Sequence, residues 1–392
     1  MKQPKLRFNA DDGNQYPEWE EKRLEEVAVR ITRKNKDNCT DIPLTISSVD
    51  GLIDQRDFFN KIVASKDMSG YYLLKRGEFA YNKSYSKGFD FGSIKRLNLY
   101  DEGALSTLYI CFALNDNEDS DFYQKYFDSL SWYPELQKIC AEGARNHGLL
   151  NVSANDFFQL KLHVPKSKEE QQKIASLFTE LDNLIQSAEK ELEGYRELKQ
   201  GMLQKMFPKK GEKVPEIRFP EFTGDWEQRK LGELCDITTG KLDANAMNPD
   251  GEYDFYTSGI DVYKIDKAAF SGPAITIAGN GANVGYLHLA DGYFNAYQRT
   301  YILTNFLANR QFLYSSIGVT LPCKIYEEVR GSGVPYIVLN MLTDLVIQLP
   351  SQEEQFKIAE HFSNLDNLIT IQQKELDGYK ELKKGLLQQM FC

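Results

Sequence analysis

The sequence predicts an α+β protein with two globular domains separated by an antiparallel coiled coil of two long, near-identical helices, related by pseudo-two-fold symmetry. Three observations predict this architecture. Residues 166–207 and 350–391 align without gaps, with 26 identities in 42 positions. The segments that precede the two copies share only short flanking motifs with each other. Both of these segments carry short apolar runs bounded by Gly, Asn and Asp, which is the pattern of strands and turns.

The first globular domain is expected over residues 1–165 and the second over residues 208–349. Strand-like runs occupy residues 71–74 and 105–113 of the first domain and residues 274–278 and 300–304 of the second. A helix rich in Phe, Tyr and Trp is expected over residues 121–140. Each domain therefore mixes strands with helix.

The repeated segments are predicted to be spacer helices over residues 166–207 and 350–392. Each begins with the Ser-x-x-Glu pattern of a capping box. Apolar residues then recur in alternating steps of four and three, which is the seam of a coiled coil. The obvious partner of each helix is the other copy. About 40 residues span roughly 60 Å, so we expect the second domain to begin at the far end and the second helix to return antiparallel, giving a dumbbell.

Bulk composition restricts the function classes. The 392 residues carry a net charge of −10, which opposes nucleic-acid binding unless a local surface is basic. Residues 75–96 supply such a local excess, with six basic and two acidic residues. The six cysteines and four histidines are scattered, so neither a disulfide framework nor a metal site is expected. No secretion signal or membrane span is evident, which favours a cytoplasmic protein.

Several motifs, agreeing in order and spacing, resemble the specificity subunit of Type I restriction–modification systems over essentially the whole chain. The helices carry E-E-Q-x-K-I-A, L-D-N-L-I and K-E-L-x-G-Y-x-E-L-K in both copies. Each domain opens on a Trp-containing motif, W-E-E-K-R-L-E-E-V at residues 19–27 and W-E-Q-R-K-L-G-E-L at residues 226–234. The resemblance implies two target recognition domains, each reading half of an asymmetric bipartite DNA site. It also implies that the helices set the spacing between half-sites.

The same resemblance implies the partners and cofactors. Double-stranded DNA and two methyltransferase subunits are expected, with restriction/translocase subunits as an optional addition. The chain itself is expected to be non-catalytic and to hold no cofactor, while S-adenosylmethionine, ATP and Mg²⁺ belong to the partner subunits. Consistent with this, the sequence contains neither a phosphate-binding Gly-x-x-x-x-Gly-Lys-Ser/Thr loop nor an Asn-Pro-Pro-Tyr methyltransferase motif.

Base-contacting residues are expected in polar, Gly- and Asn-rich loops, because Arg suits guanine edges, Asn and Gln suit adenine, and Lys and Ser suit phosphates. The candidates in the first domain are Asn82, Lys83, Ser84, Tyr85, Lys87, Ser106, Thr107, Arg145 and Asn146. Those in the second domain are Asn280, Asn283, Gln298, Arg299, Arg330 and Ser332. Each could equally be structural or solvated.

Partner docking is expected on helix positions that are identical in the two copies, because two equal surfaces suit two copies of one subunit. The candidates are Lys173, Asp182, Lys190 and Glu197, with their counterparts Lys357, Asp366, Lys374 and Glu381. A recent duplication would also leave such identities. The competing function is a scaffold with two modules on a coiled-coil strut that binds ligands other than DNA. A complete enzyme with a fused recognition domain is a third alternative, disfavoured by the missing motifs.

Overall fold

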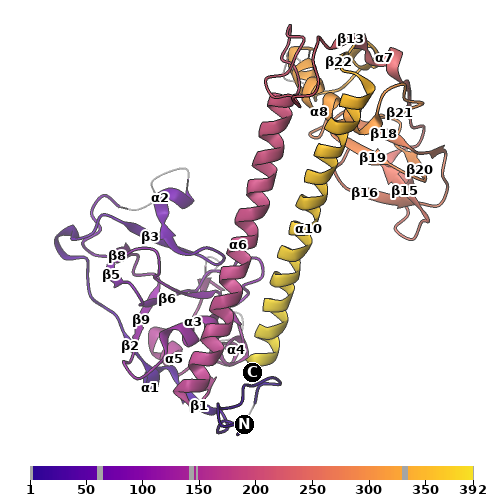
Figure 1. Ribbon diagram of the computed structural model, residues 1–392. Coiled ribbons are helices and arrows are strands. Elements are labelled where there is room, and N and C mark those ends of the chain that lie inside the picture. The colour runs from indigo at the N-terminus through magenta and orange to yellow at the C-terminus, as the bar shows by residue number, and fades with distance from the viewer. Residues whose placement is uncertain (1–2, 60–64, 141–144, 147–148, 329–333, 392) are drawn as a thin grey trace. The chain divides into compact units, whose positions relative to one another are not determined.

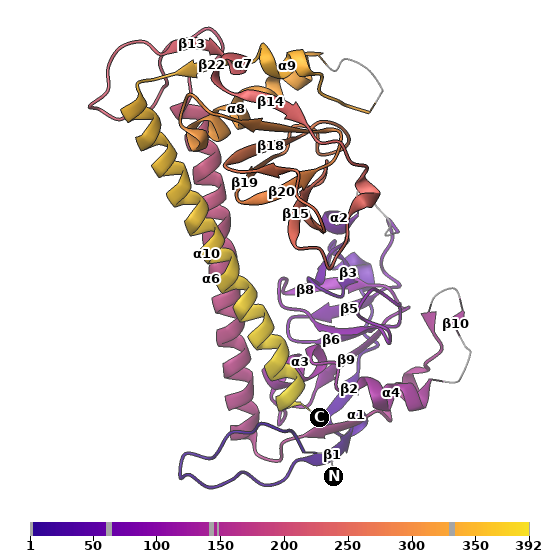
Figure 2. The same cartoon turned by 90° about the vertical axis from the view of Figure 1, so that its right-hand side faces the viewer.

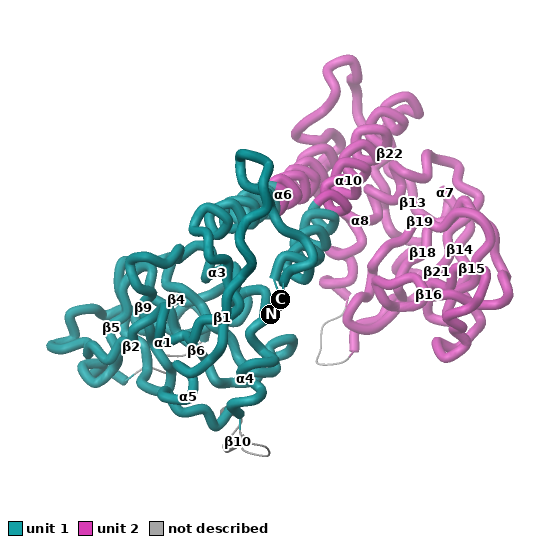
Figure 3. Tube along the Cα trace, turned by 90° about the horizontal axis from the view of Figure 1, so that it is seen from below, with its two compact units in different colours: residues 1–187, 376–392 teal, residues 188–375 magenta. Residues whose placement is uncertain are grey.

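A computed structural model describes residues 3–59, 65–140, 145–146, 149–328 and 334–391 (Figure 1). The chain divides into two compact units (Figure 3): residues 1–187 with 376–392, and residues 188–375. Each unit contains one globular part and about half of each long helix. The helices are therefore integral to both units, whereas the sequence suggested four successive segments. Within the described ranges, no helix combines the length and apolar character needed to cross a membrane.

Two four-stranded sheets form the globular part of unit 1. One has the antiparallel order β2 (Ala28–Arg30), β9 (Ile110–Leu114), β6 (Phe79–Asn82), β7 (Ser93–Arg96). The other has the order β4 (Gly51–Asp54), β3 (Pro43–Ser47), β8 (Glu102–Leu105), β5 (Tyr72–Lys75), with β3 and β8 parallel. Shorter pairs join β1 (Glu20–Arg23) to β12 (Lys161–Val164) and β10 (Arg145–Asn146) to β11 (Leu149–Leu150).

Short helices cover these sheets: α1 (Leu24–Val27), α2 (Gln55–Phe58), α3 (Ser120–Asp128), α4 (Tyr133–Ile139), α5 (Ala154–Phe158) and the 3-10 turn η1 (Lys36–Asn38). The single helix expected over residues 121–140 is thus two helices. Leu130 adopts a positive φ of 61° between them, which an α-helix cannot contain. The strand-like run at 105–113 is likewise the end of β8, a turn and most of β9.

Unit 2 is built on the same plan. Its first sheet has the order β14 (Asp236–Thr239), β21 (Thr300–Thr304), β18 (Ala274–Ala278), β19 (Leu287–Ala290). Its second has the order β16 (Val262–Ile265), β15 (Tyr253–Tyr256), β20 (Tyr293–Ala296), β17 (Phe270–Ser271), with β15 and β20 parallel. The remaining elements are β13 (Glu227–Lys230), β22 (Val346–Leu349), α7 (Leu231–Leu234), α8 (Arg310–Glu328), α9 (Leu339–Thr343) and the 3-10 turn η2 (Ala244–Ala246).

The two globular parts therefore share one topology although their sheet sequences do not align. Strands β2 to β9 correspond one to one with β14 to β21, in strand order and in parallel or antiparallel sense. The pair β1–β12 corresponds to β13–β22. What the two parts have in common is strand order and pairing sense, which do not require residue identity.

The repeated segments form α6 (Lys168–Met206) and α10 (Gln352–Met390), each of 39 residues. In unit 1 the first half of α6 packs antiparallel to the end of α10, since Phe178 stacks on Phe391 while Asp182 pairs with Lys383. Unit 2 repeats this arrangement with Phe207 on Phe362 and Lys199 paired with Asp366. The predicted coiled-coil pairing of the two copies is confirmed within each unit (Figure 1).

The starts of both helices differ from the predicted capping box. Ser167 and Ser351 do accept the amide hydrogens three residues later, at 3.4 and 3.3 Å. The carboxylates of Glu170 and Glu354, however, are buried and form bidentate ion pairs with Arg7 and Arg218, at 2.8–2.9 Å. The glutamates thus fasten the segment before each globular part to a helix start.

Matching segments also close the end of each helix. In unit 2, the Ile217 amide donates to the Lys205 carbonyl at the end of α6, 2.9 Å away. In unit 1 the Leu6 amide donates to the Gln389 carbonyl at the end of α10, 3.0 Å away, so the two chain termini lie together (Figure 2). Beyond these contacts, Met206 and Phe207 enter the core of unit 2 as Met390 and Phe391 enter that of unit 1.

Candidate nucleic-acid interface

One edge of each unit collects the loops that carry the predicted DNA-binding residues. In unit 1 the ends of β3, β6 and β8 and the starts of β7 and β9 meet there, because β3 runs parallel to β8 and β6 runs antiparallel to β7 and β9. We call residues 48–50, 82–92 and 106–109 the loop edge of unit 1. Its counterpart, the loop edge of unit 2, comprises residues 257–261, 279–285 and 297–300.

Local hydrogen bonds hold the loop edge of unit 1 together. The Asn82 side chain accepts the Ser84 amide hydrogen at 2.9 Å, which turns the chain directly after β6. The Lys83 carbonyl accepts the Leu150 amide at 3.0 Å and so brings the β10–β11 hairpin beside this loop. Three of the predicted stretches therefore converge: residues 82–87, residues 106–107 and the strand that contains Arg145 and Asn146. The side chains of Arg145 and Asn146 lie outside the described structure.

The basic stretch at residues 75–96 does not form one basic surface. Arg76, Lys95 and Arg96 form ion pairs with Asp101, Asp128 and Asp121. Lys95 and Arg96 lie on β7, and Arg76 lies in the turn between β5 and β6, at the end of β6 away from the loop edge. Lys83 and Lys87 lie in the loop edge, and neither has an ion-pair partner among the residues that the structure describes. These two lysines are therefore the basic residues of the loop edge that can offset the acidic net charge locally.

In unit 2, a close approach of two backbones defines the loop edge. The Gly279 amide donates to the Arg299 carbonyl at 2.9 Å, and the Ile337 amide donates to the Gly279 carbonyl at 2.8 Å. A methyl group on Gly279 would lie 2.2 Å from the Arg299 carbonyl oxygen, so only glycine fits. The sequence identified this Gly- and Asn-rich loop but not the contact that demands the glycine.

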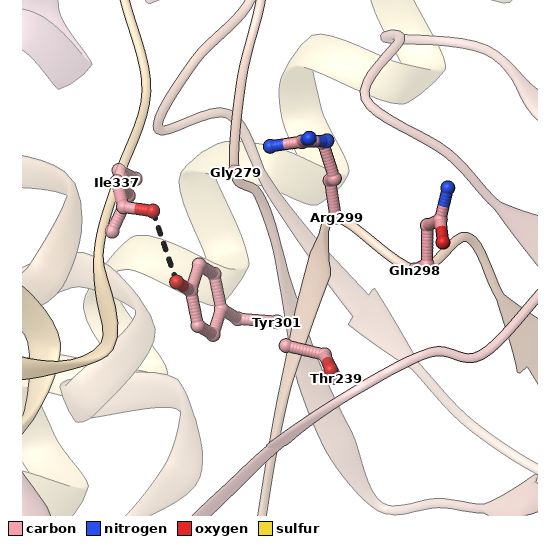
Figure 4. A pocket seen from close by; sticks show the side chains of 6 residues that line it. All are labelled: Thr239, Gly279, Gln298, Arg299, Tyr301 and Ile337. Carbon is pink, nitrogen blue, oxygen red and sulfur yellow. Dashed lines mark hydrogen bonds between the residues drawn. The ribbon is translucent and has the colours of Figure 1, made fainter.

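A cavity of about 300 Å³ opens at this point (Figure 4). It is lined by Thr239, Gly279, Gln298, Arg299, Tyr301 and Ile337. The Tyr301 hydroxyl donates to the Ile337 carbonyl at 2.9 Å and fixes the cavity wall. Gln298 and Arg299 are exposed, and the Arg299 guanidinium has no acidic partner within the described ranges. The arrangement offers one amide and one guanidinium group to a ligand that accepts hydrogen bonds.

Of the other candidates in unit 2, Asn280 accepts the Ser258 hydroxyl at 2.6 Å, and Asn283 lies in the turn whose carbonyl accepts the Tyr286 amide. Both are half-buried at the loop edge. Arg330 and Ser332 lie outside the described residues. Near this edge, burial lowers the pKa of His288, despite a contact with the Gly259 carbonyl that raises it, and its ring lies against Tyr256 and Tyr286. This histidine is a packed residue.

The candidate pairs of the two domains occupy equivalent turns. In unit 1 the Tyr109 amide donates to the Ser106 carbonyl at 3.2 Å; in unit 2 the Thr300 amide donates to the Tyr297 carbonyl at 2.8 Å. Each turn precedes the second strand of its first sheet. Thr107 therefore corresponds to Gln298, and the exposed Leu108 corresponds to Arg299. No sequence signal links these turns, because only the strand register aligns them.

On the helices, half of the predicted partner-docking residues have internal roles. Lys173 contacts Asp11, and Lys357 contacts Glu221. Asp182 bonds Lys125 at 2.5 Å and Lys383 at 2.6 Å, and Asp366 bonds Lys199 at 2.5 Å. Conserving these contacts within each unit accounts for their identity in both copies. The exposed predicted residues are Lys190, Glu197, Lys374 and Glu381, and identical exposed leucines accompany them at positions 184, 368, 198 and 382.

Comparisons with known proteins agree with this architecture. The family model described as "Type I restriction modification DNA specificity domain" matches residues 16–194 and 223–379. The chain belongs to this family. It is 43% identical to the Type I restriction enzyme EcoDI specificity subunit of Escherichia coli over 141 residues, which are 36% of the chain but only 31% of that relative.

A second relative is matched over more of its length. The Type I restriction enzyme MjaVIII specificity subunit of Methanocaldococcus jannaschii is 28% identical over 324 residues, 73% of each chain. Among solved structures, the S subunit of a Type I restriction–modification system from M. genitalium superposes with a TM-score of 0.62 at 16% identity, covering 100% of this chain and 99% of that one. The predicted fold class and the resemblance to specificity subunits are thereby confirmed.

Proposed function

We propose that each loop edge reads one half of an asymmetric, two-part DNA sequence. The observation that carries this proposal is the equivalence of the two edges. Two domains with one topology present the same turns, yet these turns carry different side chains, Thr107 and Leu108 in one and Gln298 and Arg299 in the other. Two domains with the same backbone topology but different contact residues suit the recognition of two different half-sites.

The chemistry of the edge of unit 2 favours base contacts in the major groove. Arg299 offers the bidentate donor that suits guanine O6 and N7, and Gln298 offers the donor–acceptor pair that suits adenine. In unit 1, Lys83 and Lys87 suit phosphates, while Asn82 and Ser84 stand beside them. Because few basic groups at either edge lack an acidic partner, the chain alone is expected to bind DNA weakly.

Partner subunits therefore complete the DNA complex in this proposal. Two methyltransferase subunits bind the exposed, duplicated helix surface around Lys190, Glu197, Leu184 and Leu198 and its copy on α10. The exposed leucines support this assignment, since identical apolar side chains at solvent-facing positions of both helices offer two equal docking surfaces. The chain acts as a cytoplasmic, non-catalytic specificity subunit; S-adenosylmethionine, ATP and Mg²⁺ act in its partners, which include restriction/translocase subunits where present.

Methylome sequencing of cells with and without the gene tests the proposal. The expected result is a two-part, asymmetric motif whose methylation depends on the gene. Duplexes carrying that motif are then compared with scrambled duplexes in salt-dependent binding assays, using the chain together with its methyltransferase partners. An unchanged methylome, together with equal binding to both duplexes, would favour the scaffold function instead.

A further inference from the structure

A second feature of the two loop edges is the same in both units. The hairpin β3–β4 turns through residues 48–50, and the equivalent hairpin β15–β16 turns through residues 257–261. Both hairpins extend past the end of their parallel neighbour, because β8 ends opposite Leu44 and β20 ends opposite Tyr256. Their tips therefore project at the loop edges.

A serine side chain anchors each tip. The Ser48 hydroxyl lies 2.9 Å from that of Ser86 and 3.1 Å from that of Ser93. The Ser258 hydroxyl donates to Asn280 at 2.6 Å. In both units, the bond joins the hairpin to the loop that follows the central strand of the first sheet. The tips are thus held against the candidate DNA-binding loops.

Within each anchored tip, one β-branched aliphatic side chain faces solvent. Val49 is 82% exposed, and Ile260 is 52% exposed. The tip of unit 1 is further tightened by bonds between Ser47 and Asp50, at 2.7 and 3.0 Å. Scattered exposed aliphatic residues are ordinary. Val49 directly follows its anchoring serine in the turn 48–50, and Ile260 lies two residues after its own in the turn 257–261, so the two units share an exposed aliphatic side chain in the equivalent anchored tip rather than at one exact position.

We propose that Val49 and Ile260 are apolar wedges that press into the base stack, one in each half-site, and distort the duplex there. This rests on the proposed function. The two domains differ where they would read bases but agree at these tips, so the shared contact is independent of sequence. Apolar side chains inserted between base steps partially unstack them, as in proteins that kink DNA from its minor groove. β-Branched side chains suit this task because few rotamers are open to them.

The test uses the full chain with its methyltransferase partners, on duplexes carrying the mapped motif. Val49→Ala and Ile260→Ala are compared with the matched controls Leu99→Ala and Leu307→Ala. Leu99 is 61% exposed and Leu307 is 72% exposed, and both follow strands at the end of the sheets opposite the loop edges. All four positions are exposed, so the variants should fold. The readouts are binding affinity and the fluorescence of 2-aminopurine placed in either half-site, which rises when a base unstacks.

We expect each wedge variant to weaken binding about tenfold, from the loss of two or three aliphatic carbons at the contact. The loss should be equal on the motif and on duplexes with single base changes, and the 2-aminopurine signal should fall in one half-site only. Wedge variants that behave like the controls would overturn the proposal. A loss confined to one base-pair position would also overturn it, since Val49 or Ile260 would then read a base. Failure of the wild-type complex to prefer its motif would instead refute the proposed function.

Discussion

Replacing Phe391 with alanine is expected to destabilise unit 1 as severely as a core substitution, although the residue lies just beyond the last turn of α10. Phe391 is 4% exposed. Its ring centroid lies 5.6 Å from that of Phe178, 5.9 Å from Phe122, 5.8 Å from Tyr126 and 6.4 Å from Trp19. Phe391 therefore belongs to the core of unit 1.

The magnitude follows from burial and ring contacts. Phe→Ala substitutions in cores cost about 3–5 kcal/mol, and each well-placed aromatic pair contributes about 0.5–1.5 kcal/mol beyond burial. With four aromatic neighbours, Phe391→Ala should fall in the upper part of that range. Phe207→Ala should cost unit 2 a similar amount, because Phe207 is also 4% exposed and packs against Trp226, Phe312 and Phe362.

Urea denaturation followed by tryptophan fluorescence measures the effect, with Gln389→Ala as an exposed control on the last turn of α10. The Phe391 variant should unfold unit 1 at markedly lower urea, and the control should match wild type. A loss below about 1 kcal/mol would contradict the reasoning, because this is the range of surface substitutions. It would mean that the end of α10 is not part of the core of unit 1.

Two further predictions concern charge and backbone. Burial raises the pKa of Asp182, but hydrogen bonds from Lys125 and Lys383 lower it more, so the pKa lies below its usual 3.8. A depressed carboxyl pKa stabilises the fold above that value and loses this contribution as pH falls through the folded-state pKa. Asp182→Asn should therefore cost about 1–2 kcal/mol at neutral pH, allowing for partial exposure, and progressively less as the pH falls below 3.8. Thermal unfolding across pH measures this cost, and a cost that does not change with pH would contradict the prediction. Gly279→Ala should displace the Arg299 backbone and lower binding to the motif at least tenfold, while binding to non-specific DNA stays unchanged. An unaltered preference for the motif would show that the contact between Gly279 and Arg299 does not position the turn that reads DNA.

The elements with a strong period were predictable from the sequence. The helices expected over residues 166–207 and 350–392 are observed as α6 and α10, because a 3.5-residue apolar period runs along most of each helix, broken in the second copy by Gln372. The strands expected at 274–278 and 300–304 coincide with β18 and β21, which are buried apolar runs. The local spacing of apolar residues is therefore enough to specify these helices and strands.

Features that depend on distant contacts were not predictable. Nothing local shows that Glu170 leaves its capping role for Arg7, a residue 163 positions away. The shared topology of the two domains was also hidden, because equivalent turns such as 106–109 and 297–300 share strand register but no residues. The internal ion pair of Lys173 with Asp11 shows how identity between repeats can record folding as well as partner binding.

The central claim is that each loop edge specifies one half of a two-part DNA sequence. Replacing Gln298 and Arg299 with Thr and Leu, the residues of the equivalent turn of unit 1, tests it most directly when the methylome is read out. We expect one half of the methylated motif to change or become degenerate while the other half is retained. Alteration of both halves, or an unchanged motif at undiminished methylation, would contradict it.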